Sequence, residues 1–447
     1  MLACLLLLLP GCRHDAGSSP ARLRVVFWAG VEEQKIEQAN VDAFMATHPG
    51  ITVSLESIPD NYLEKLVTAF AAHRPPDVLL LDSVLIPRFL DGDVLLDLQP
   101  YIARDASFNP NQFFPKVWQI AVRPGGASVP AGDGGAGVLA GGQGSQAQGL
   151  APPRVYALPK DFTPLVVYYN KRVFDAAGVP YPRDGWTWQD FRATAAALTS
   201  PGSTAGKVAA RYGTSISSWV GSDIVWFWQA GGDVLSPDGK RASGHLDGAD
   251  SIRAVEFFTG LVADGLSPDP TTQEALGGQA FMTGRIAMTI SGHWAMPGFS
   301  AAVDESSGAL SLSDVGVAGL PRDKVRASVI YESGWAVAKE SRQPELAVEL
   351  AKYLAGPEAQ ARRAGMGLAI SADRSVAEKF AADDPRERAF LAEVPYGYAP
   401  WGTRISEWST VESLLQEGIE RVLLGRASAA DSMRETARLI DDELNLH

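Results

Sequence analysis

The feature that most constrains the fold is an alternation of short apolar runs with helical runs in the first third of the chain. Leu23 to Phe27, Ile51 to Leu55 and Val78 to Leu81 are short β-rich runs, and the last is continuously apolar. Between them, Glu32 to Thr47 and Tyr62 to Phe70 carry apolar residues at helical spacing, and each is followed by Pro, which ends helices. Strands that alternate with helices predict an α/β fold with an open, mostly parallel sheet covered on both faces.

Later segments continue the alternation. Further strands are predicted at Leu165 to Tyr169, Ala287 to Ile290, Val315 to Ala318 and Gly334 to Ala338. Further helices are predicted at Trp188 to Leu198, Ser251 to Ala263, Pro344 to Leu354, Glu407 to Leu424 and Ser428 to Leu444. The chain of 447 residues is long enough for two or three domains with large cores.

Charge argues against nucleic acid as a partner. The formal net charge is -13, and no long run of Lys or Arg occurs. Binding to a phosphate backbone depends on clustered cations, so this class of partner is excluded.

The N-terminus reads as an export leader. Met1 to Leu9 is apolar but shorter than the roughly 20 residues that span a bilayer. Its ending, Leu9-Pro10-Gly11-Cys12, resembles a bacterial lipobox, which implies cleavage before Cys12 and a lipid anchor on that residue; an ordinary secretory leader is the alternative. We therefore expect a tether over Arg13 to Arg22 and a location in the cell envelope, periplasmic or on the extracellular face. No cysteine follows Cys12, so no disulfide can stabilise the mature fold.

One segment interrupts the pattern. Arg123 to Pro153 is rich in Gly, Ala and Gln and has no aromatic residue, so we expect a flexible insertion there. Within it, Gly132 to Gly137 forms a GxGxxG, but neither the strand nor the helix that a dinucleotide fingerprint requires flanks it. No cofactor is expected.

Catalytic and metal motifs are not evident. The six histidines include no i, i+4 pair, and neither a Gly-x-Ser-x-Gly elbow nor a phosphate-binding Walker loop occurs. His293 is interpreted as a loop or pocket-rim residue, with a catalytic base as the alternative. Carboxylates are numerous, so a glycosidase pair stays open. We expect a protein that is not an enzyme and holds no metal.

Several motifs resemble the carbohydrate-binding proteins of bacterial ABC importers, the family that includes maltose-binding protein. The clearest is Leu158 to Pro164, followed by Val166 to Lys171. Others occur in the same order as in the family: Phe70-Ala71-Ala72 with Pro76-Asp77-Val78, Ala177-Gly178-Val179-Pro180 with Gly185-Trp186-Thr187-Trp188, Phe281 to Met288 with Gly292-His293-Trp294, and Gly334 to Val337. Apart from the Gly-rich insertion, the resemblance runs from Leu23 to the C-terminus.

The resemblance implies a periplasmic-binding-protein-like fold, in which two α/β lobes close on a sugar in the cleft between them. By position, three crossing segments are expected near Asp161 to Leu165, Ala287 to Ser291 and Val329 to Ser333. Lobe one would hold residues 23–160, with the insertion at 123–153, and residues 292–330. Lobe two would hold residues 165–287 and 334–447. The expected partners are a carbohydrate and the permease subunits of an ABC transporter, and the protein is expected to be a monomer.

The candidate ligand-binding residues follow from chemistry as well as position. In open α/β sheets, ligands bind beyond the carboxyl ends of strands, where Trp28 and Asp82 lie. Sugars present apolar ring faces to aromatic side chains and hydroxyl groups to charged ones. The aromatic candidates are Trp28, Trp219, Trp226, Trp294, Trp335, Tyr398 and Trp401. The charged candidates are Glu32, Asp82, Lys160, Asp161 and Arg404, with Glu33 as the neighbouring alternative to Glu32.

Each candidate also has a structural interpretation. Trp186 and Trp188 flank a helix start and are expected to brace it, and Trp228 is expected in the core. Three functions remain open. The first is capture of a sugar, with an oligosaccharide as the favoured class. The second is capture of a glycerol-phosphate-type solute through Arg404 and Lys160. The third is a secreted glycoside hydrolase.

Overall fold

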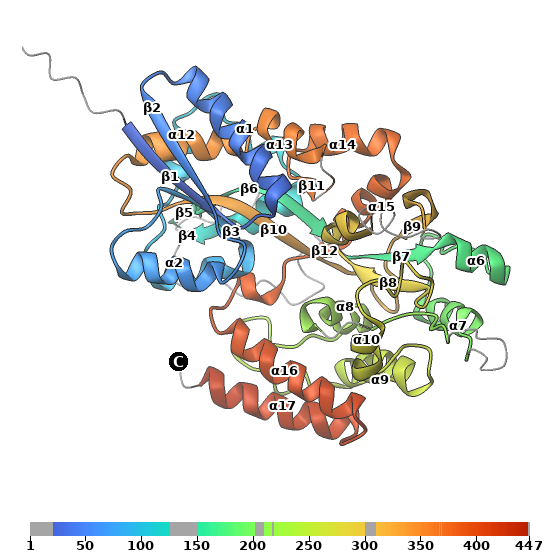
Figure 1. Ribbon diagram of the computed structural model, residues 1–447. Helices are drawn as coiled ribbons and strands as arrows, with labels where there is room; N and C mark the ends of the chain where they lie inside the picture. The colour runs from blue at the N-terminus through green and yellow to red at the C-terminus, as the bar shows by residue number, and fades with distance from the viewer. Residues whose placement is uncertain are drawn as a thin grey trace, which may run out of the picture.

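The computed structural model describes residues 21–125, 151–201, 210–216, 219–299, 310–365, 367 and 369–445. The leader with Cys12, and the GxGxxG of the insertion, lie outside these ranges. Figure 1 shows α1, α12, α13 and α14 on one side of the strands and α16, α17 and α9 on the other.

The largest sheet begins with the predicted strand–helix alternation. Its first three strands are β1 (Ala21–Phe27), β2 (Ile51–Ser57) and β3 (Val78–Asp82), and they pair in parallel, with β1 between the other two. The connecting helices are α1 (Val31–Thr47) and α2 (Tyr62–Ala71). This part of the sheet is as predicted.

The remainder of that sheet corrects the expectation of mostly parallel pairing. The full order is β11-β6-β10-β3-β1-β2, with β12 on β10. The added strands are β6 (Ala157–Pro164), β10 (Ser328–Val337), β11 (Ile370–Ser371) and β12 (Gly397–Tyr398). β10 runs antiparallel to β3 and β6, and β11 runs antiparallel to β6. Parallel neighbours in a sheet need a crossover connection, usually a helix. β6 and β10 enter the sheet along other routes, so the sheet is mixed.

A second sheet of three strands has β7 (Val166–Asn170) at its centre. β8 (Met288–Ser291) and β9 (Val315–Ala318) flank it, both antiparallel to it. Along β7, Val166 and Tyr168 belong to one core, whereas Val167 and Tyr169 belong to another. Because successive side chains of a strand point to opposite faces, this small sheet is buried on both sides, which explains why its sequence is continuously apolar.

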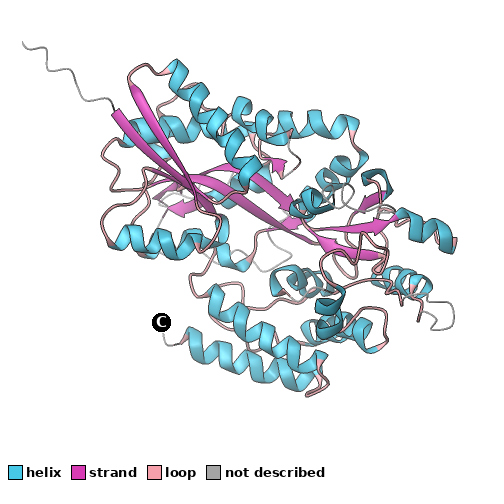
Figure 2. Cartoon of the chain, viewed as in Figure 1, coloured by secondary structure: helices cyan, strands magenta, loops and turns pink. Residues whose placement is uncertain are grey.

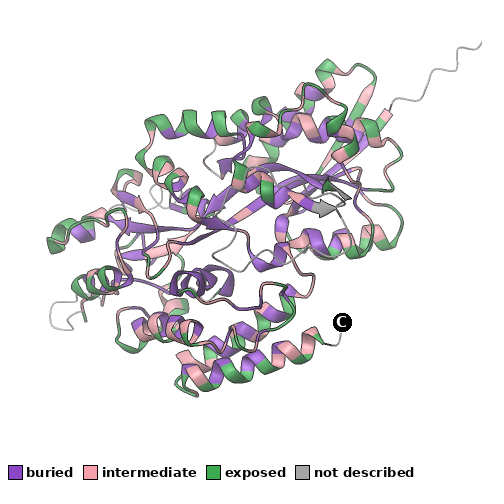
Figure 3. Cartoon of the chain, turned by 180° about the vertical axis from the view of Figure 1, so that it is seen from behind, coloured by how far each residue is buried: buried purple, intermediate pink, exposed green. Residues whose placement is uncertain are grey.

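The remaining helices surround these sheets (Figure 2). They are α3 (Ile86–Asp91), α4 (Gln99–Ala103), α5 (Pro115–Ala121), α6 (Lys171–Ala177), α7 (Trp188–Leu198), α8 (Val220–Ala230), α9 (Ala249–Ala263), α10 (Pro270–Leu276), α12 (Pro344–Leu354), α13 (Pro357–Ala364), α14 (Arg374–Asp383), α15 (Pro385–Glu393), α16 (Trp408–Leu423) and α17 (Ala429–Leu444). All residues of α8 are buried, which Figure 3 shows by the purple colour of this helix, and they include the polar residues Ser222, Asp223 and Gln229.

Two main cores lie on either side of the small sheet. The first gathers residues of β1, β3, β6 and β10 with α1 and α12, and the second gathers α7, α8, α9, α16 and α17. The three expected crossing segments lie where buried residues change core: Phe162 to Leu165, Met288 to Met296, and Val329 to Ile330. The chain therefore has the two-lobed architecture, and buried residues also change core between Val315 and Leu320 and between Val394 and Tyr398.

Packing suggests a lobe boundary that differs from the expected one. Residues 334–447 were expected in lobe two, yet α12 and α14 and residues Phe390 and Val394 contribute to the first core. Tyr398, Trp401 and the helices α16 and α17 contribute to the second. We therefore propose that residues 334–394 belong to lobe one and that the chain returns to lobe two near Tyr398.

The ends of the Gly-rich insertion are regular. β4 (Val122–Gly125) and β5 (Ala151–Val155) form an antiparallel ribbon in which Arg123 is opposite Arg154. The expectation of a flexible insertion from Arg123 to Pro153 is wrong at both ends. There the backbone N–H and C=O groups form hydrogen bonds between β4 and β5, despite the composition of these segments. Residues 126–150, on which the rest of that prediction falls, lie outside the described ranges.

Candidate ligand-binding cavity

A cavity of about 450 Å³ lies between the two lobes, at the end of β3 and along β6 and β10. It brings together six of the candidate residues: Trp28, Asp82, Lys160, Asp161, Trp219 and Trp294. It also includes Glu33, the alternative to Glu32, and residues that were not predicted as ligand contacts: Val84, Phe162, Thr163, Tyr331, Glu332, Ser333 and Ala369.

Strand register places the polar residues of the cavity in a row. On β10, Ser333 lies opposite Asp82 of β3 on one side and opposite Asp161 of β6 on the other. The hydroxyl of Ser333 donates to Oδ1 of Asp161 at 2.5 Å. Between Ser333 and Gly334 the register shifts, so that Lys160 has no partner on β10. Such bulges redirect side chains and are frequent near functional sites.

Lys160 is surrounded by carboxylates. Its Nζ donates to Oε1 of Glu33 at 2.8 Å and to Oδ2 of Asp161, and the residue is 4% exposed. Burial alone would lower the pKa of Lys160, but the attraction of Asp161, Glu33 and Glu37 outweighs burial and raises it. Lys160 is therefore a cation whose charge is compensated by the protein itself.

The other two carboxyl groups of the cavity are shifted toward the neutral form. Burial, together with the nearby charge of Asp161, raises the pKa of Asp82 to about 6, although Asp82 accepts a hydrogen bond from the Val84 N–H. Burial raises the pKa of Glu332 well above its ordinary value, and Asp82 and Asp161 raise it further. Neither oxygen of Glu332 has a hydrogen-bond partner among the described residues.

Three aromatic rings form one wall. Trp219 is 41% exposed and Trp294 is 45% exposed, which is unusual for side chains of this size. Their ring centroids are 6.2 Å apart, and Tyr331 lies 5.2 Å from Trp219 and 5.9 Å from Trp294. Nε1 of Trp219 donates to Oε1 of Glu412 at 2.9 Å, and the Tyr331 hydroxyl donates to the Gly221 carbonyl at 2.8 Å. Apolar ring faces thus stand beside hydrogen-bonding carboxylates.

Three of the other candidates lie away from this cavity. Trp226 is 1% exposed in the second core, and Trp335 is fully buried against Phe27 in the first, so neither ring can stack on a solute. Glu32 points to solvent and accepts a hydrogen bond from Lys35, whereas the next residue, Glu33, lines the cavity. One residue along a helix turns the side chain by about 100°, and the amino-acid pattern alone did not decide which of the two faces inward.

The C-terminal candidates also lie elsewhere. Tyr398 and Arg404 line a separate cavity of about 230 Å³, and Trp401 is 2% exposed. Nε1 of Trp401 donates to Oδ1 of Asp233 at 2.7 Å. Tyr398 and Trp401 of this loop pack in the second core, and neither they nor Arg404 line the ligand cavity.

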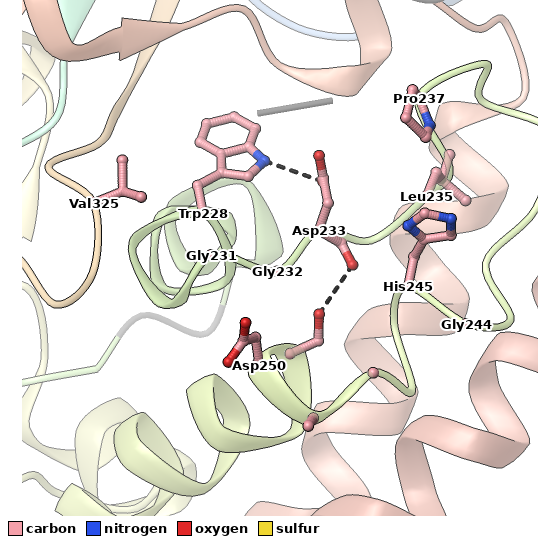
Figure 4. A pocket seen from close by; sticks show the side chains of 13 residues that line it. Trp228, Gly231, Gly232, Asp233, Leu235, Pro237, Gly244, His245, Asp250 and Val325 are labelled. Carbon is pink, nitrogen blue, oxygen red and sulfur yellow. Dashed lines mark hydrogen bonds between the residues drawn. The ribbon is translucent and has the colours of Figure 1, made fainter. Parts of the chain in front are cut away.

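Asp233 borders a third cavity, of about 460 Å³, shown in Figure 4. The same Oδ1 accepts a hydrogen bond from Nε1 of Trp228 at 3.1 Å, and the Asp233 carbonyl accepts one from Ser251. Trp228 is 6% exposed within the second core, as predicted. Burial raises the pKa of Asp233, although three hydrogen bonds to the carboxylate oppose that shift.

The interpretation of His293 as a loop or pocket-rim residue is wrong, because its side chain is buried and does not line the cavity. It is 1% exposed, its Nε2 lies 2.7 Å from Oε1 of Glu387, and its backbone N–H donates to the Thr163 hydroxyl. Trp294, the next residue, is the one that reaches the cavity. In the part of the chain that the structure describes, no group of three or more His, Cys, Asp or Glu residues is arranged to hold a metal ion. No helix within the described ranges is long and apolar enough to cross a bilayer.

Comparison with known proteins agrees with this architecture. Residues 28–361 match the family of bacterial extracellular solute-binding proteins. A binding protein of Brucella abortus is 23% identical over 297 residues, covering 65% of this chain and 61% of the relative, so the match spans about three fifths of this curated relative.

Two solved structures share the fold. The sugar-binding protein MalE of Xanthomonas citri has a TM-score of 0.76 at 23% identity, covering 95% of this chain and 98% of that one. A substrate-binding protein of an ABC transporter from Listeria monocytogenes, solved in complex with cycloalternan, has a TM-score of 0.75 at 22% identity, covering 95% of this chain and 99% of that one. The family match covers most of the chain and the fold is shared along its length, so this chain belongs to the bacterial extracellular solute-binding protein family.

Proposed function

We propose that this protein captures a sugar, with an oligosaccharide as the favoured class, in the cavity between its lobes and delivers it to an ABC importer without catalysing a reaction. The observation that carries the proposal is the exposed wall of Trp219, Trp294 and Tyr331 beside Asp82 and Asp161. Aromatic rings stack on the apolar faces of sugar rings, and carboxylates accept hydrogen bonds from sugar hydroxyl groups.

The charges of the cavity favour a neutral solute over a phosphodiester. Among the described residues that line the cavity, Glu33, Asp82, Asp161 and Glu332 are acidic and Lys160 is the one cation. Lys160 already binds Glu33 and Asp161, so it does not offer an uncompensated charge to a phosphate. Arg404, the other basic residue considered for a phosphodiester, lines a different cavity.

The proposal includes the cellular context. Family membership and the lipobox-like sequence before Cys12 support a protein held by a lipid anchor in the cell envelope, on its periplasmic or extracellular face, and acting as a monomer beside its permease. Metabolic labelling with a fatty-acid analogue tests the anchor: the protein should carry the label, and Cys12→Ser should not.

Titration calorimetry against mono-, di- and oligosaccharides tests the binding function, with glycerophosphodiesters in the same panel. A saccharide should bind the unaltered protein, and Trp294→Ala should weaken this binding by roughly fivefold, since one aromatic contact contributes about 1 kcal/mol. The matched control is Phe380→Ala, which removes an aromatic ring of similar exposure on α14, outside the cavity.

Two other outcomes would contradict the proposal and favour another function. Binding of phosphodiesters but no saccharide would favour the alternative solute class. Turnover of a labelled oligosaccharide that Asp82→Asn or Asp161→Asn abolishes would establish a glycoside hydrolase instead.

A further inference from the structure

Behind the crossing strand β10 lies the separate cavity of about 230 Å³, hereafter the rear cavity. Three separate parts of the chain form it: α5 with β4, the crossing strand at Ile330, and the segment from β12 to Arg404. The residues that line it are Lys116, Gln119, Ile120, Val122, Arg123, Ile330, Gly397, Tyr398, Ala399, Thr403 and Arg404.

Arg123 is the central polar residue of the rear cavity. It is only 9% exposed, and its Nη1 donates to the Thr403 carbonyl. Its Nε and Nη2 have no hydrogen-bond partner among the described residues. These two N–H groups leave the same edge of the planar guanidinium, which is the geometry that binds two oxygens of one carboxylate or phosphate.

A second unpartnered donor lies in the same wall. The Tyr398 hydroxyl is buried and has no partner among the described residues, and Tyr398 as a whole is 8% exposed. Buried donors are nearly always hydrogen-bonded, because an unpaired one costs about 1–3 kcal/mol. Two such residues in one cavity indicate that an acceptor belongs between them.

The charges of the rear cavity indicate that the acceptor is an anion. Lys116, Arg123 and Arg404 line it, whereas none of the described residues that line it is acidic. Arg404 lies over the Trp401 ring at 4.7 Å, and Nζ of Lys116 lies 5.5 Å from the Tyr398 ring centroid, so aromatic faces hold these two cations in place. Burial lowers the pKa of Arg123 to about 10, which leaves it charged at neutral pH.

The nearest acid does not neutralise Arg123. Glu332 attracts it electrostatically, but the Glu332 carboxyl accepts no hydrogen bond from any described residue. Burial and the neighbouring Asp82 and Asp161 hold the pKa of Glu332 well above its ordinary value. Within the described ranges, no carboxylate forms an ion pair with Lys116, Arg123 or Arg404, although Glu332 attracts Arg123 and Asp233 attracts Arg404 electrostatically.

We propose that the rear cavity is a second binding site, distinct from the ligand cavity, and that it takes a small oxyanion through the free edge of Arg123 and the Tyr398 hydroxyl. The two sites have opposite character: carboxylates and exposed tryptophans line the first, and basic residues line the second. A bound oxyanion would link α5 and β4 to the segment that contains Tyr398 and Arg404.

Thermal unfolding with inorganic phosphate as the probe tests the proposal. The melting temperature should rise with phosphate and saturate, above the rise given by sodium chloride at equal ionic strength, because a ligand of the native state stabilises it. Arg123→Gln and Arg404→Gln should lose this excess. The matched control is Arg154→Gln, which removes the exposed arginine opposite Arg123 on the same ribbon and should keep the excess.

Two further variants locate the bound anion. Lys160→Gln should keep the effect of phosphate, and its loss in that variant alone would place the anion in the ligand cavity and overturn the proposal. If Arg123→Gln does not fold, as judged by circular dichroism, Lys116→Gln serves in its place, with binding followed by phosphorus NMR. An excess that survives in Arg123→Gln, or a rise no larger than that with chloride, would also overturn the proposal.

Discussion

At the cavity, single glycines determine how the two tryptophan rings are presented. A Cβ atom on Gly292 would lie 2.5 Å from the Trp294 ring, and one on Gly221 would collide with the Trp219 ring and lie 2.5 Å from the Tyr331 hydroxyl oxygen. Each ring lies over a glycine, which has no side chain to displace the ring. The exposure of the two rings therefore depends on these glycines as well as on the tryptophans.

Gly292→Ala should displace Trp294 and weaken saccharide binding by roughly fivefold, since one aromatic contact is worth about 1 kcal/mol. Calorimetry measures the affinity, and tryptophan emission reports the displaced ring. Gly298→Ala is the matched control, because a Cβ there meets no atom within 4 Å. An unchanged affinity in Gly292→Ala would mean that Trp294 does not need its present orientation.

Asp82 predicts a pH dependence of stability. Its pKa is about 6 in the folded protein against an ordinary 3.8, so the folded state holds this proton more tightly than the unfolded state does. Stability from this group is therefore present below pH 3.8 and is lost as pH rises through 6. Asp82→Asn should raise the free energy of unfolding at pH 7.5, by at most about 3 kcal/mol.

Urea unfolding of both proteins between pH 4 and pH 8 measures this difference. The gain in Asp82→Asn over the unaltered protein should shrink as pH falls below 6. A constant difference across that range would show that the Asp82 carboxyl is not the titrating group.

At the scale of elements, β10 connects the features described above. It pairs with β3, β6 and β12, and it passes from the second core at Val329 to the first at Ile330. Tyr331, Glu332 and Ser333 line the ligand cavity, whereas Ile330 lines the rear cavity. One strand thus borders two sites of opposite charge.

An ion pair between helices holds α13 on α1. Glu37 is fully buried and receives both Nε and Nη2 of Arg363, the latter at 2.8 Å. Burial alone would raise the pKa of Glu37, but the attraction and hydrogen bonds of Arg363 outweigh it and lower the pKa. This stabilisation is present above the ordinary pKa of 4.5 and is lost as pH falls below it.

Arg363→Met should therefore lower the free energy of unfolding by roughly 3–5 kcal/mol at pH 7, because it leaves a buried carboxylate without its partner. The loss should be smaller at pH 4, where Glu37 can take a proton instead. Arg374→Met is the control, since Arg374 is half exposed and its pair with Glu378 is a surface pair worth less than about 1 kcal/mol. Equal losses in the two variants, measured by urea unfolding, would contradict this role of the buried pair.

At the scale of the whole molecule, two cores joined by crossing segments predict a closing motion. Ligand contacts made by both lobes would favour a closed state, because a ligand shifts the equilibrium toward the state it binds more tightly. Saturating saccharide should decrease the radius of gyration measured by X-ray scattering. It should also shift tryptophan emission to shorter wavelength as Trp219 and Trp294 become buried. A saccharide that does not bind in calorimetry is the control, and an unchanged radius with bound ligand would exclude closure.

Local sequence determined much of the architecture. The spacing of apolar residues from Leu23 to Leu81 is sufficient for three strands and two helices, because each element needs only its own periodicity and a terminating Pro or Gly. Likewise, Trp28 and Asp82 follow parallel neighbouring strands, so they share one edge of the sheet and line one cavity. The ordered motifs also indicated the solute-binding family to which the chain belongs.

Tertiary structure decided which of the remaining polar and aromatic residues meet. Trp294 and Trp335 both follow or lie in strands, yet one is 45% exposed and the other fully buried, because that depends on what packs against each strand. Strand direction in β6 and β10, the bulge at Lys160 and the return of Tyr398 to the second core are set by contacts between distant segments. Sequence periodicity describes one element at a time, whereas the cavity, the pKa of Asp82 and the unpaired edge of Arg123 arise only when several elements pack together.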